Sequence, residues 1–377
     1  MTTTVNNEHK NIKVPNLRFK EFQGEWEMCK FKDVCSTSTG NKNTQDKIDD
    51  GIYPFYVRSQ TVERINSWTF DGEAILTAGD GVGVGKVFHH TYGKIGVHQR
   101  VYILSNFKCD ANYLFYFFSS NFYNRVKRMS AKNSVDSVRK EMITEMPLYL
   151  PSEQEQTKIG VLLSLLDERI ATQNKIIEDL KKLKCAIIEK LYAEVKGTKY
   201  SYRQLFNIIN ERNKQLEYSN VLSASQEKGM VSREDLNLDI QFERSNINTY
   251  KIVRNGDYVI HLRSFQGGFA FSEKTGVCSP AYTILRPNGL LVYGYLSNYF
   301  TSRDFVKSLI IVTYGIRDGR SINVDEWLDM KVVIPSKEQQ THIVNVIESI
   351  ENKIKNEETY SNCLLNQKQY LLRQMFI

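Results

Sequence analysis

The sequence PSEQEQTKI at residues 151–159 opens a long helical pattern, and PSKEQQTHI at residues 335–343 opens a second one. The two stretches lie at a constant offset of 184 residues. A duplicated unit of this length indicates two similar domains, each ending in a similar long helix. Such a chain is expected to present two related surfaces at a fixed separation.

The duplication extends upstream of the helical patterns. Residues 71–77 (DGEAILT) align with residues 255–261 (NGDYVIH) at the same offset, and both stretches predict a turn followed by an apolar strand. Residues 113–120 align with residues 295–302 at an offset of 182, so a small insertion or deletion separates the blocks. Elsewhere, as at residues 60–63 and 223–228, the copies show no convincing match. A shared frame with divergent loops is typical of proteins whose loops carry binding specificity.

The composition is that of an ordinary globular chain with room for two cores, since 41% of its 377 residues are hydrophobic and 25% are charged. No apolar run approaches the ~18 residues of a membrane helix, and the first residues do not resemble a signal peptide, so a cytoplasmic protein is predicted. The six cysteines form no Cys-x-x-Cys pair. They are therefore expected to be reduced, with neither a disulfide framework nor a zinc site.

The net charge of +7 is confined to the two globular copies. Residues 1–150 carry 20 Lys and Arg against 16 Asp and Glu, and residues 197–334 carry 17 against 14, whereas the helical patterns are balanced. This distribution favours an anionic partner that is bound by the domains. The alternative is that so small a surplus in each domain has arisen by chance.

Each helical pattern carries five heptads with two seam positions, which is the signal of a coiled coil. In the first helix the expected seam residues are Ile159, Leu163, Leu166, Ile170, Gln173, Ile177, Leu180, Lys184, Ile187 and Leu191. In the second they are Ile343, Ile347, Ile350, Ile354, Glu357, Ser361, Leu364, Lys368, Leu371 and Met375. Polar residues recur at matching seam positions, which lowers stability but fixes register and partner choice.

Each helix is expected to be about 60 Å long at 1.5 Å per residue, and neither can bury such a seam alone. The simplest arrangement pairs the two helices with each other in antiparallel orientation. This would place the domains at opposite ends of the pair, with a pseudo-twofold axis between them. The alternative is dimerisation of two chains through the same seams.

A glycine-rich stretch at residues 79–86 (GDGVGVGK) invites comparison with a phosphate-binding loop. The comparison fails because Asp80 stands where the first glycine is required and Val87 stands where Ser or Thr would bind magnesium. We interpret the stretch as a turn whose backbone approaches a ligand closely, such as a DNA phosphate, rather than as a nucleotide pocket. The pair His89-His90 is interpreted as a polar loop, since no histidine spacing matches a metal site.

The sequence contains no Gly-x-Ser-x-Gly nucleophile motif, no Asn-Pro-Pro-Tyr methyltransferase motif and no pair of carboxylates whose spacing demands a catalytic role. Catalysis by this chain alone is therefore not expected.

Residues 15–26 (PNLRFKEFQGEW) resemble the characteristic opening of the specificity subunit of type I restriction–modification systems. The two helix starts, together with residues 146–148 and 330–332 before them, resemble the central and distal conserved regions of that family, and so do residues 371–376 (LLRQMF). The resemblance covers the entire chain. The second helix start departs from the first at residues 337–339, which read KEQ against EQE.

The resemblance implies an α+β fold in which an antiparallel pair of long coiled-coil helices separates two similar target recognition domains. The implied organisation is an N-terminal conserved segment at 1–25, recognition domains at 26–150 and 197–334, and spacer helices at 151–196 and 335–377. Each domain would read one half of a bipartite site in double-stranded DNA, and the helices would set the unread gap.

The resemblance also implies that this chain has no catalytic residue and binds no cofactor itself. It would recruit two modification subunits, which methylate adenine with S-adenosylmethionine. It would also recruit restriction subunits, which use ATP and Mg to translocate and cleave foreign DNA.

Base edges and phosphates are contacted by polar and basic side chains on exposed loops. In the first domain the candidates are Arg58, Gln60, Arg64, Lys86, His89, His90, Gln99, Arg100, Lys132, Asn133 and Ser134. In the second they are Ser223, Ser225, Gln226, Lys228, His261, Arg263, Gln266, Arg317, Arg320 and Ser321. For each of them an ordinary solvated side chain is the alternative. The aromatic run at residues 113–118 is interpreted as core packing rather than as a base-stacking surface.

A competing hypothesis is a coiled-coil scaffold whose two domains bind proteins, with the mild basicity incidental. The two hypotheses differ in their response to salt, because affinity for DNA falls steeply as salt rises.

Overall fold

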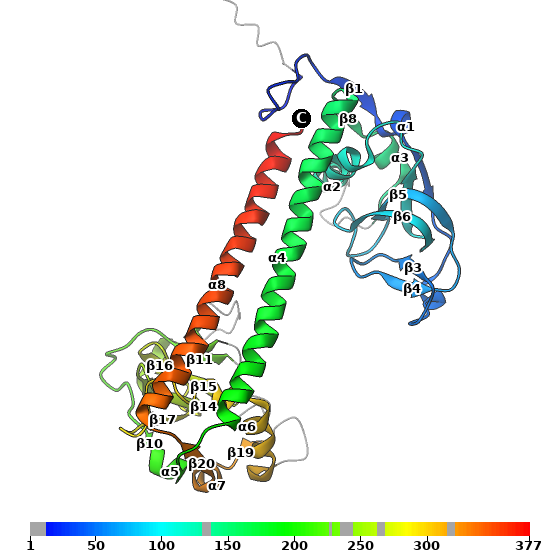
Figure 1. The fold of residues 1–377 in the computed structure, drawn as a ribbon. Helices are drawn as coiled ribbons and strands as arrows, with labels where there is room; N and C mark the ends of the chain where they lie inside the picture. Colours follow the sequence, from blue (N-terminus) through cyan, green and yellow to red (C-terminus); the bar gives the residue numbers. More distant parts are fainter. Residues whose placement is uncertain (1–12, 130–136, 226–227, 234–243, 262–267, 315–320) are drawn as a thin grey trace, which may run out of the picture. The chain divides into compact units, whose positions relative to one another are not determined.

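The computed structural model of the chain describes residues 13–129, 137–225, 228–233, 244–261, 268–314 and 321–377. Two compact units are present (Figure 1): the first comprises Met1–Asn174 and Thr359–Ile377, and the second comprises Lys175–Glu358. The long helices α4 (Glu153–Ala193) and α8 (Lys337–Gln374) each contribute a part to both units. No helix among the described residues is long and apolar enough to cross a membrane.

The first unit contains a six-stranded sheet in the order β2-β7-β5-β6-β3-β4. Its strands are β2 (Ser36–Thr39), β3 (Tyr53–Tyr56), β4 (Glu63–Ile65), β5 (Phe70–Ala78), β6 (Phe88–Val97) and β7 (Val101–Ser105). A second sheet pairs β1 (Glu27–Lys30) with β8 (Pro147–Leu150). The helical elements are α1 (Phe31–Val34), η1 (Thr44–Asp46), α2 (Ala111–Met129) and α3 (Lys140–Thr144).

The second unit contains a four-stranded sheet in the order β10-β17-β14-β15. Its strands are β10 (Phe206–Ile209), β14 (Tyr258–Ile260), β15 (Phe269–Phe271) and β17 (Thr283–Pro287). The strand pairs are β9 (Thr198–Ser201) with β20 (Lys331–Ile334), β11 (Leu222–Ser225) with β12 (Gly229–Ser232), β13 (Lys251–Val253) with β16 (Gly276–Cys278), and β18 (Thr313–Tyr314) with β19 (Ser321–Ile322). The helical elements are α5 (Tyr202–Leu205), η3 (Arg244–Thr249), η4 (Tyr299–Thr301), α6 (Arg303–Ser308), η5 (Leu309–Val312) and α7 (Val324–Asp329).

The two units repeat one topology. The order β2-β7-β5-β6 in the first corresponds to β10-β17-β14-β15 in the second. In both, a strand pair (β1 with β8, β9 with β20) connects the entry of the unit to the start of its long helix. The α+β class and the duplicated frame predicted from the sequence are confirmed, and the copies differ in the segments added around that frame.

The strand that carries residues 71–77 differs from its prediction. The sequence predicts a turn at Asp71-Gly72, but β5 already begins at Phe70, so this part of the prediction is wrong. The reason is the long pairing of β5 with β6, in which Gly72 lies opposite Gly93 and both glycines have positive φ. In the second unit the turn is confirmed, because Gly256 lies just before β14 with φ of 94°.

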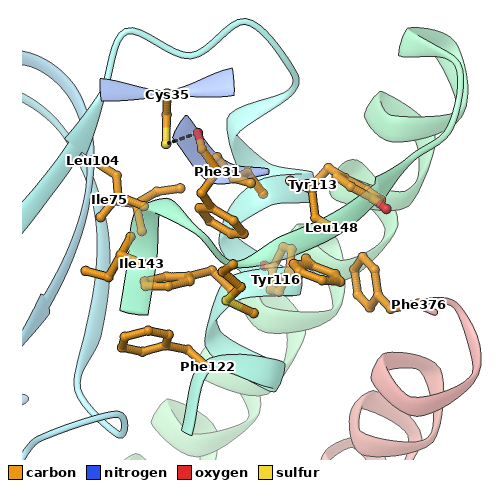
Figure 2. Packing of buried hydrophobic residues seen from close by; sticks show 14 of the residues in the cluster. Phe31, Cys35, Ile75, Leu104, Tyr113, Tyr116, Phe122, Ile143, Leu148 and Phe376 are labelled. Carbon is orange, nitrogen blue, oxygen red and sulfur yellow. Dashed lines mark hydrogen bonds between the residues drawn. The ribbon is translucent and has the colours of Figure 1, made fainter. Parts of the chain in front are cut away.

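The core of the first unit forms around the aromatic face of α2 (Figure 2). Tyr113, Phe117 and Phe118 are buried, which confirms the prediction that this run packs the core. Phe376, which follows α8, packs against Tyr113 with ring centroids 5.2 Å apart. Phe376 therefore completes the core of the first unit.

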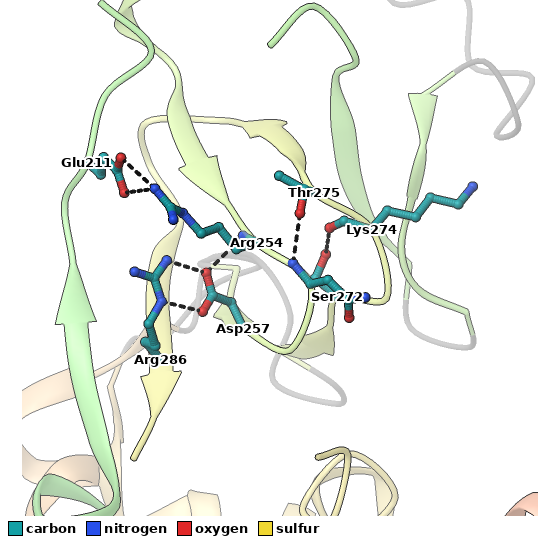
Figure 3. A network of polar contacts seen from close by, with 8 residues as sticks. Glu211, Arg254, Asp257, Ser272, Lys274, Thr275 and Arg286 are labelled. Atoms are coloured by element: carbon teal, nitrogen blue, oxygen red, sulfur yellow. Dashed lines mark hydrogen bonds and ion pairs between the residues drawn. The ribbon is translucent and has the colours of Figure 1, made fainter. Parts of the chain in front are cut away.

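The core of the second unit is built on a stacked pair of rings. Tyr202 on α5 and Trp327 on α7 lie 4.3 Å apart between centroids at an interplanar angle of 11°. Beyond this core, a polar network holds the turn before β14 (Figure 3). The buried Asp257 carboxylate accepts two hydrogen bonds from the Arg286 guanidinium and one from the Arg254 backbone N–H, each of 2.9 Å. These bonds compensate for the burial of the carboxylate.

The repeated sequence at the helix starts forms the same contact in both units. The side-chain amide of Gln156 donates to the Pro151 carbonyl at 2.8 Å, and its oxygen accepts from the Asp110 backbone N–H at 3.0 Å. Ser152 accepts from the Glu155 backbone N–H, which caps the helix.

In the second unit, Gln340 is 1% exposed and occupies the matching position. It donates to the carbonyls of Pro335 and Leu290 at 3.1 and 3.0 Å and accepts from the Val292 backbone N–H at 2.8 Å. Each glutamine therefore fixes the helix start to the segment that follows β7 or β17.

The expected seam residues of both helices are all buried or half-buried. In the first unit, Lys368 contacts Asp167 at 2.5 Å and Ser361 donates to Asn174 at 3.0 Å. From the first contact to the second, the residue number rises on α4 and falls on α8. The helix parts in this unit are therefore antiparallel.

The second unit has the same arrangement. Lys184 contacts Glu351 at 2.5 Å, and Lys181 contacts Glu358 at 2.7 Å. The Lys184–Glu351 pair matches the Lys368–Asp167 pair at the offset of 184 residues, so this interhelical ion pair is repeated in both copies. Pairing of the helices within one chain is confirmed in each unit.

Replacing Gln340 with alanine would leave the carbonyl of Leu290 and the N–H of Val292 without their side-chain partner. We expect Gln340→Ala to lower the free energy of unfolding by about 1–3 kcal/mol. Amide hydrogen exchange at residues 290–292 and at the start of α8 measures the local loss. Gln339→Ala is the matched control, because this neighbouring glutamine is exposed. Equal exchange in the two variants would contradict the role of Gln340.

The interhelical ion pair of the second unit can be tested by charge reversal. Lys184→Glu and Glu351→Lys each place like charges opposite one another, whereas the double variant restores an opposite pair. We expect a coupling energy of about 0.2–1 kcal/mol, because both side chains are partly exposed. Lys182→Glu is the control, since Lys182 pairs with Glu178 on its own helix. Additive effects of the two single reversals would show that the pair does not help to fix the register.

Candidate nucleic-acid interface

Three loops of the first unit bring predicted site residues together at Asp80. Arg58 follows β3, and Arg100 lies between β6 and β7. The Asp80 carboxylate accepts a hydrogen bond from Arg58 Nη1 at 2.8 Å, and its other oxygen lies 3.7 Å from Arg100 Nε. The Asp80 side chain is 26% exposed, whereas those of Arg58 and Arg100 are 43% and 66% exposed. Both guanidinium groups are therefore accessible, with the carboxylate set deeper beneath them.

The glycines of residues 79–86 allow these loops to approach each other. The Gly79 backbone N–H donates to the Arg100 carbonyl at 2.7 Å, and a Cβ at Gly79 would lie 2.9 Å from the same oxygen. A Cβ at Gly83 would lie 2.5 Å from the Arg58 carbonyl oxygen. The stretch forms a turn, as predicted, and its close approach to protein backbone accounts for these two glycines without any ligand.

A buried histidine supports the Arg100 loop. His98 is 5% exposed, and its Nδ1 accepts from the Arg100 backbone N–H at 3.0 Å. Burial lowers the pKa of His98, and the nearby charge of Arg58 lowers it further. Both effects favour the neutral ring that can accept this hydrogen bond.

The pair His89-His90 lies in strand β6, so the predicted polar loop is wrong. These residues belong to the pairing of β6 with β5, and their rings are held by neighbours. His89 Nε2 lies 3.2 Å from the Ser59 carbonyl, and burial lowers the pKa of His89. His90 Nε2 lies 3.0 Å from Glu73 Oε1, and its ring stacks on Phe115.

The other described candidates of the first unit fall into two groups. Lys86 and Gln60 are exposed, and Lys86 lies 5.3 Å above the Tyr123 ring. Two further candidates support loops: Gln99 donates to Asn43 at 2.6 Å, and Arg64 donates to the carbonyls of Gly51 and Ile52 at 2.9 Å.

In the second unit, Ser223 and Ser225 lie on β11 and Lys228 lies in the turn before β12. Ser223 accepts from Arg233 at 3.2 Å, and Ser225 accepts from the Lys228 backbone N–H at 3.3 Å. His261 follows β14, and Ser321 begins β19. The predicted site residues outside the described part of the chain are Lys132, Asn133, Ser134, Gln226, Arg263, Gln266, Arg317 and Arg320.

Asp80 and His98 organise the cluster in the first unit, but neither is among the site residues predicted from the sequence. Acidic side chains repel DNA phosphates and so are not expected to read DNA, and His98 resembles any isolated histidine. The one signal for Asp80 is its place between two glycines, Gly79 and Gly81.

Nothing in the described part of the chain groups three His, Cys, Asp or Glu side chains in a metal-binding arrangement. All six cysteines are free. Burial raises the pKa values of Cys35, Cys109 and Cys278 to about 12, which keeps these thiols protonated and unreactive.

Residues 23–182 match the family model for the type I restriction modification DNA specificity domain. The chain is 28% identical over 168 residues to the type I restriction enzyme EcoDI specificity subunit of Escherichia coli, a match that covers 44% of this chain and 37% of that protein. It is 29% identical over 195 residues to the type I restriction enzyme MjaVIII specificity subunit of Methanocaldococcus jannaschii, covering 47% and 45%. The matched segments thus span less than half of either relative.

Two solved structures share the fold. The S subunit of a type I restriction–modification system from M. genitalium aligns with a TM-score of 0.60 at 14% identity, covering 97% of this chain and 99% of that one. A chain from a structural study of complex assembly and conformational transition of the type I R-M system aligns with a TM-score of 0.57 at 12% identity, covering 92% and 96%. At these identities the likeness concerns the fold.

Proposed function

Residues 23–182 belong to the type I restriction modification DNA specificity family, and from this premise we propose that the chain directs a restriction–modification complex to its DNA sequence. The observation that carries the proposal is the duplicated frame, in which one sheet order occurs twice and each copy continues into one of two paired helices. Two similar units on paired helices suit a site with two separate halves. Each unit would read one half, and the helices would set the gap.

The chain would act without catalysis of its own. We propose that it recruits two modification subunits, which transfer a methyl group from S-adenosylmethionine to adenine. Restriction subunits would join the same complex and use ATP and Mg. Apolar side chains exposed on the long helices support a protein partner there, among them Leu165 and Leu183 on α4 and Tyr370 on α8, which are 57%, 51% and 59% exposed.

Domain replacement tests sequence reading directly. Residues 26–145 are replaced by the corresponding segment of a relative that recognises a different sequence, and the chain is expressed with its modification subunits. Mapping methylated adenines across a genome is expected to show one half of the site changed and the other half retained, because each unit has its own core. A change in both halves, or no sequence-dependent methylation, would contradict the proposal.

Contact with phosphates is tested at an exposed lysine. Lys86 belongs to the same glycine-rich stretch as Asp80 and lies 5.3 Å above the Tyr123 ring, and Lys94 lies at the same distance above Trp68. We expect Lys86→Ala to weaken binding to all duplexes similarly and to make the salt dependence shallower by about one unit of log–log slope. Lys94→Ala removes the same charge and is the matched control. Equal effects of the two variants would exclude a specific contact at Lys86, and salt-independent binding would favour the protein scaffold.

A further inference from the structure

We propose that Asp80 is a positioning residue that presents Arg58 and Arg100 to a guanine in the half-site of the first unit. The inference rests on the proposed function. It extends that function to one base pair, which Arg58 and Arg100 would read with the support of Asp80. A carboxylate at a surface that binds DNA weakens binding by repulsion from the phosphates. Its place beneath two arginines therefore calls for another role.

The contacts of Asp80 fit the support of arginine side chains. One carboxylate oxygen accepts from Arg58 Nη1 at 2.8 Å, and the other lies 3.7 Å from Arg100 Nε. A guanidinium has five N–H donors in a planar fork. After the contact with Asp80, Arg58 retains its Nη2 edge and Arg100 retains both Nη groups for a ligand.

The backbone around Asp80 is itself fixed. The Gly79 carbonyl accepts from the Val138 backbone N–H at 2.7 Å, while the Gly79 N–H donates to the Arg100 carbonyl. Asp80 also forms an isolated β-bridge with Ser137. Because two separate segments, at Arg100 and at Ser137-Val138, hold the backbone of this turn, the carboxylate is a rigid support for the arginines.

A cavity of about 410 Å³ lies beside the carboxylate. Its polar lining includes Thr39, Asp80, Gln99 and Arg100. The Arg100 guanidinium lines this cavity together with the Gln99 side chain, whose amide N–H donates to Asn43 and whose amide oxygen is an acceptor. Side chains of these kinds are the usual readers of purine edges.

Guanine is the ligand that this arrangement favours. An arginine reads guanine by donating two parallel hydrogen bonds to O6 and N7, which requires a fixed orientation of the fork. An arginine can also bind a phosphate through this fork, but that contact carries no sequence information. Immobilisation by Asp80 before binding reduces the entropy lost on contact and so strengthens discrimination between bases.

The experiment uses the full chain and duplexes that carry its site as mapped by methylation. Each G·C pair of the half-site read by the first unit is replaced in turn by A·T. For each duplex, the dissociation constant is divided by that of the intact site to give a discrimination ratio. In the wild type we expect one G·C pair to give a ratio of about 5 to 150. Substitution of that guanine by 7-deazaguanine, which lacks the N7 acceptor, is expected to give a similar loss.

The variants separate positioning from charge. Asp80→Asn removes a negative charge, so simple electrostatics predicts equal or tighter binding to every duplex with unchanged discrimination. Positioning instead predicts that the ratio at the G·C pair falls toward 1 while affinity for unrelated DNA is kept or increased. Asp80→Glu retains the charge and moves the carboxylate, and it is expected to lower the ratio as well. Asp49→Asn is the matched control, because Asp49 is a highly exposed acid of the same unit whose ion pair is with Lys47.

The arginines are tested by substitutions that keep their charge. Arg58→Lys and Arg100→Lys retain a cation but lose the planar fork, and at least one of them is expected to abolish discrimination at the same G·C pair and the response to 7-deazaguanine. Thermal melting shows whether each variant folds. If Asp80→Asn does not fold, the Asp80→Glu and lysine variants decide whether Asp80 positions the arginines.

Three outcomes would overturn the inference. Discrimination could be unchanged in both Asp80 variants, or both lysine variants could retain it. Alternatively, arginine-to-alanine substitutions could weaken binding to all duplexes equally, which would identify phosphate contacts. A wild-type chain that prefers no duplex would instead count against the proposed function itself.

Discussion

A glutamine amide buried at the start of each long helix is the contact on which both copies depend. Gln156 and Gln340 each bind the carbonyl of the proline five residues earlier and the backbone of the segment that follows β7 or β17. A buried amide has few alternative partners, so its loss leaves several backbone groups unpaired. Through this side chain the sheet, the following segment and the long helix of each copy are held in one arrangement.

The dependence on this glutamine explains why the fold could be predicted from a short repeat. The motif is conspicuous because proline, capping serine and glutamine recur together at an offset of 184 residues, and each has a structural task. The heptads predicted the helix seams correctly, since one periodicity decides burial along a whole helix. The polar seam position Lys184 was also recognisable, but its partner Glu351 was not. That pairing depends on the register of two helices far apart in sequence.

The candidate site was less predictable, because it depends on contacts between loops. Side-chain type predicts Arg58 and Arg100 as site residues but cannot show that they converge on Asp80. It also predicts Arg64, whose guanidinium in fact binds loop carbonyls. The histidines of β6 were misread as a loop, since two adjacent polar residues give no strand signal and their strand is defined by its pairing with β5. Local sequence carries no information about such partners.

The two copies are not interchangeable where the N-terminal segment binds. Arg18 forms two hydrogen bonds of 2.8 Å with the Glu155 carboxylate, whose residue is fully buried. A carboxylate buried without a cation would be strongly destabilising. At the matching position of the second helix, Gln339 is neutral and exposed. The change from EQE to KEQ between the helix starts therefore has a physical cause. A buried acid at this position requires a cation, which Arg18 supplies to Glu155. Gln339 is exposed, and no arginine among the described residues contacts it, so a neutral residue is tolerated there.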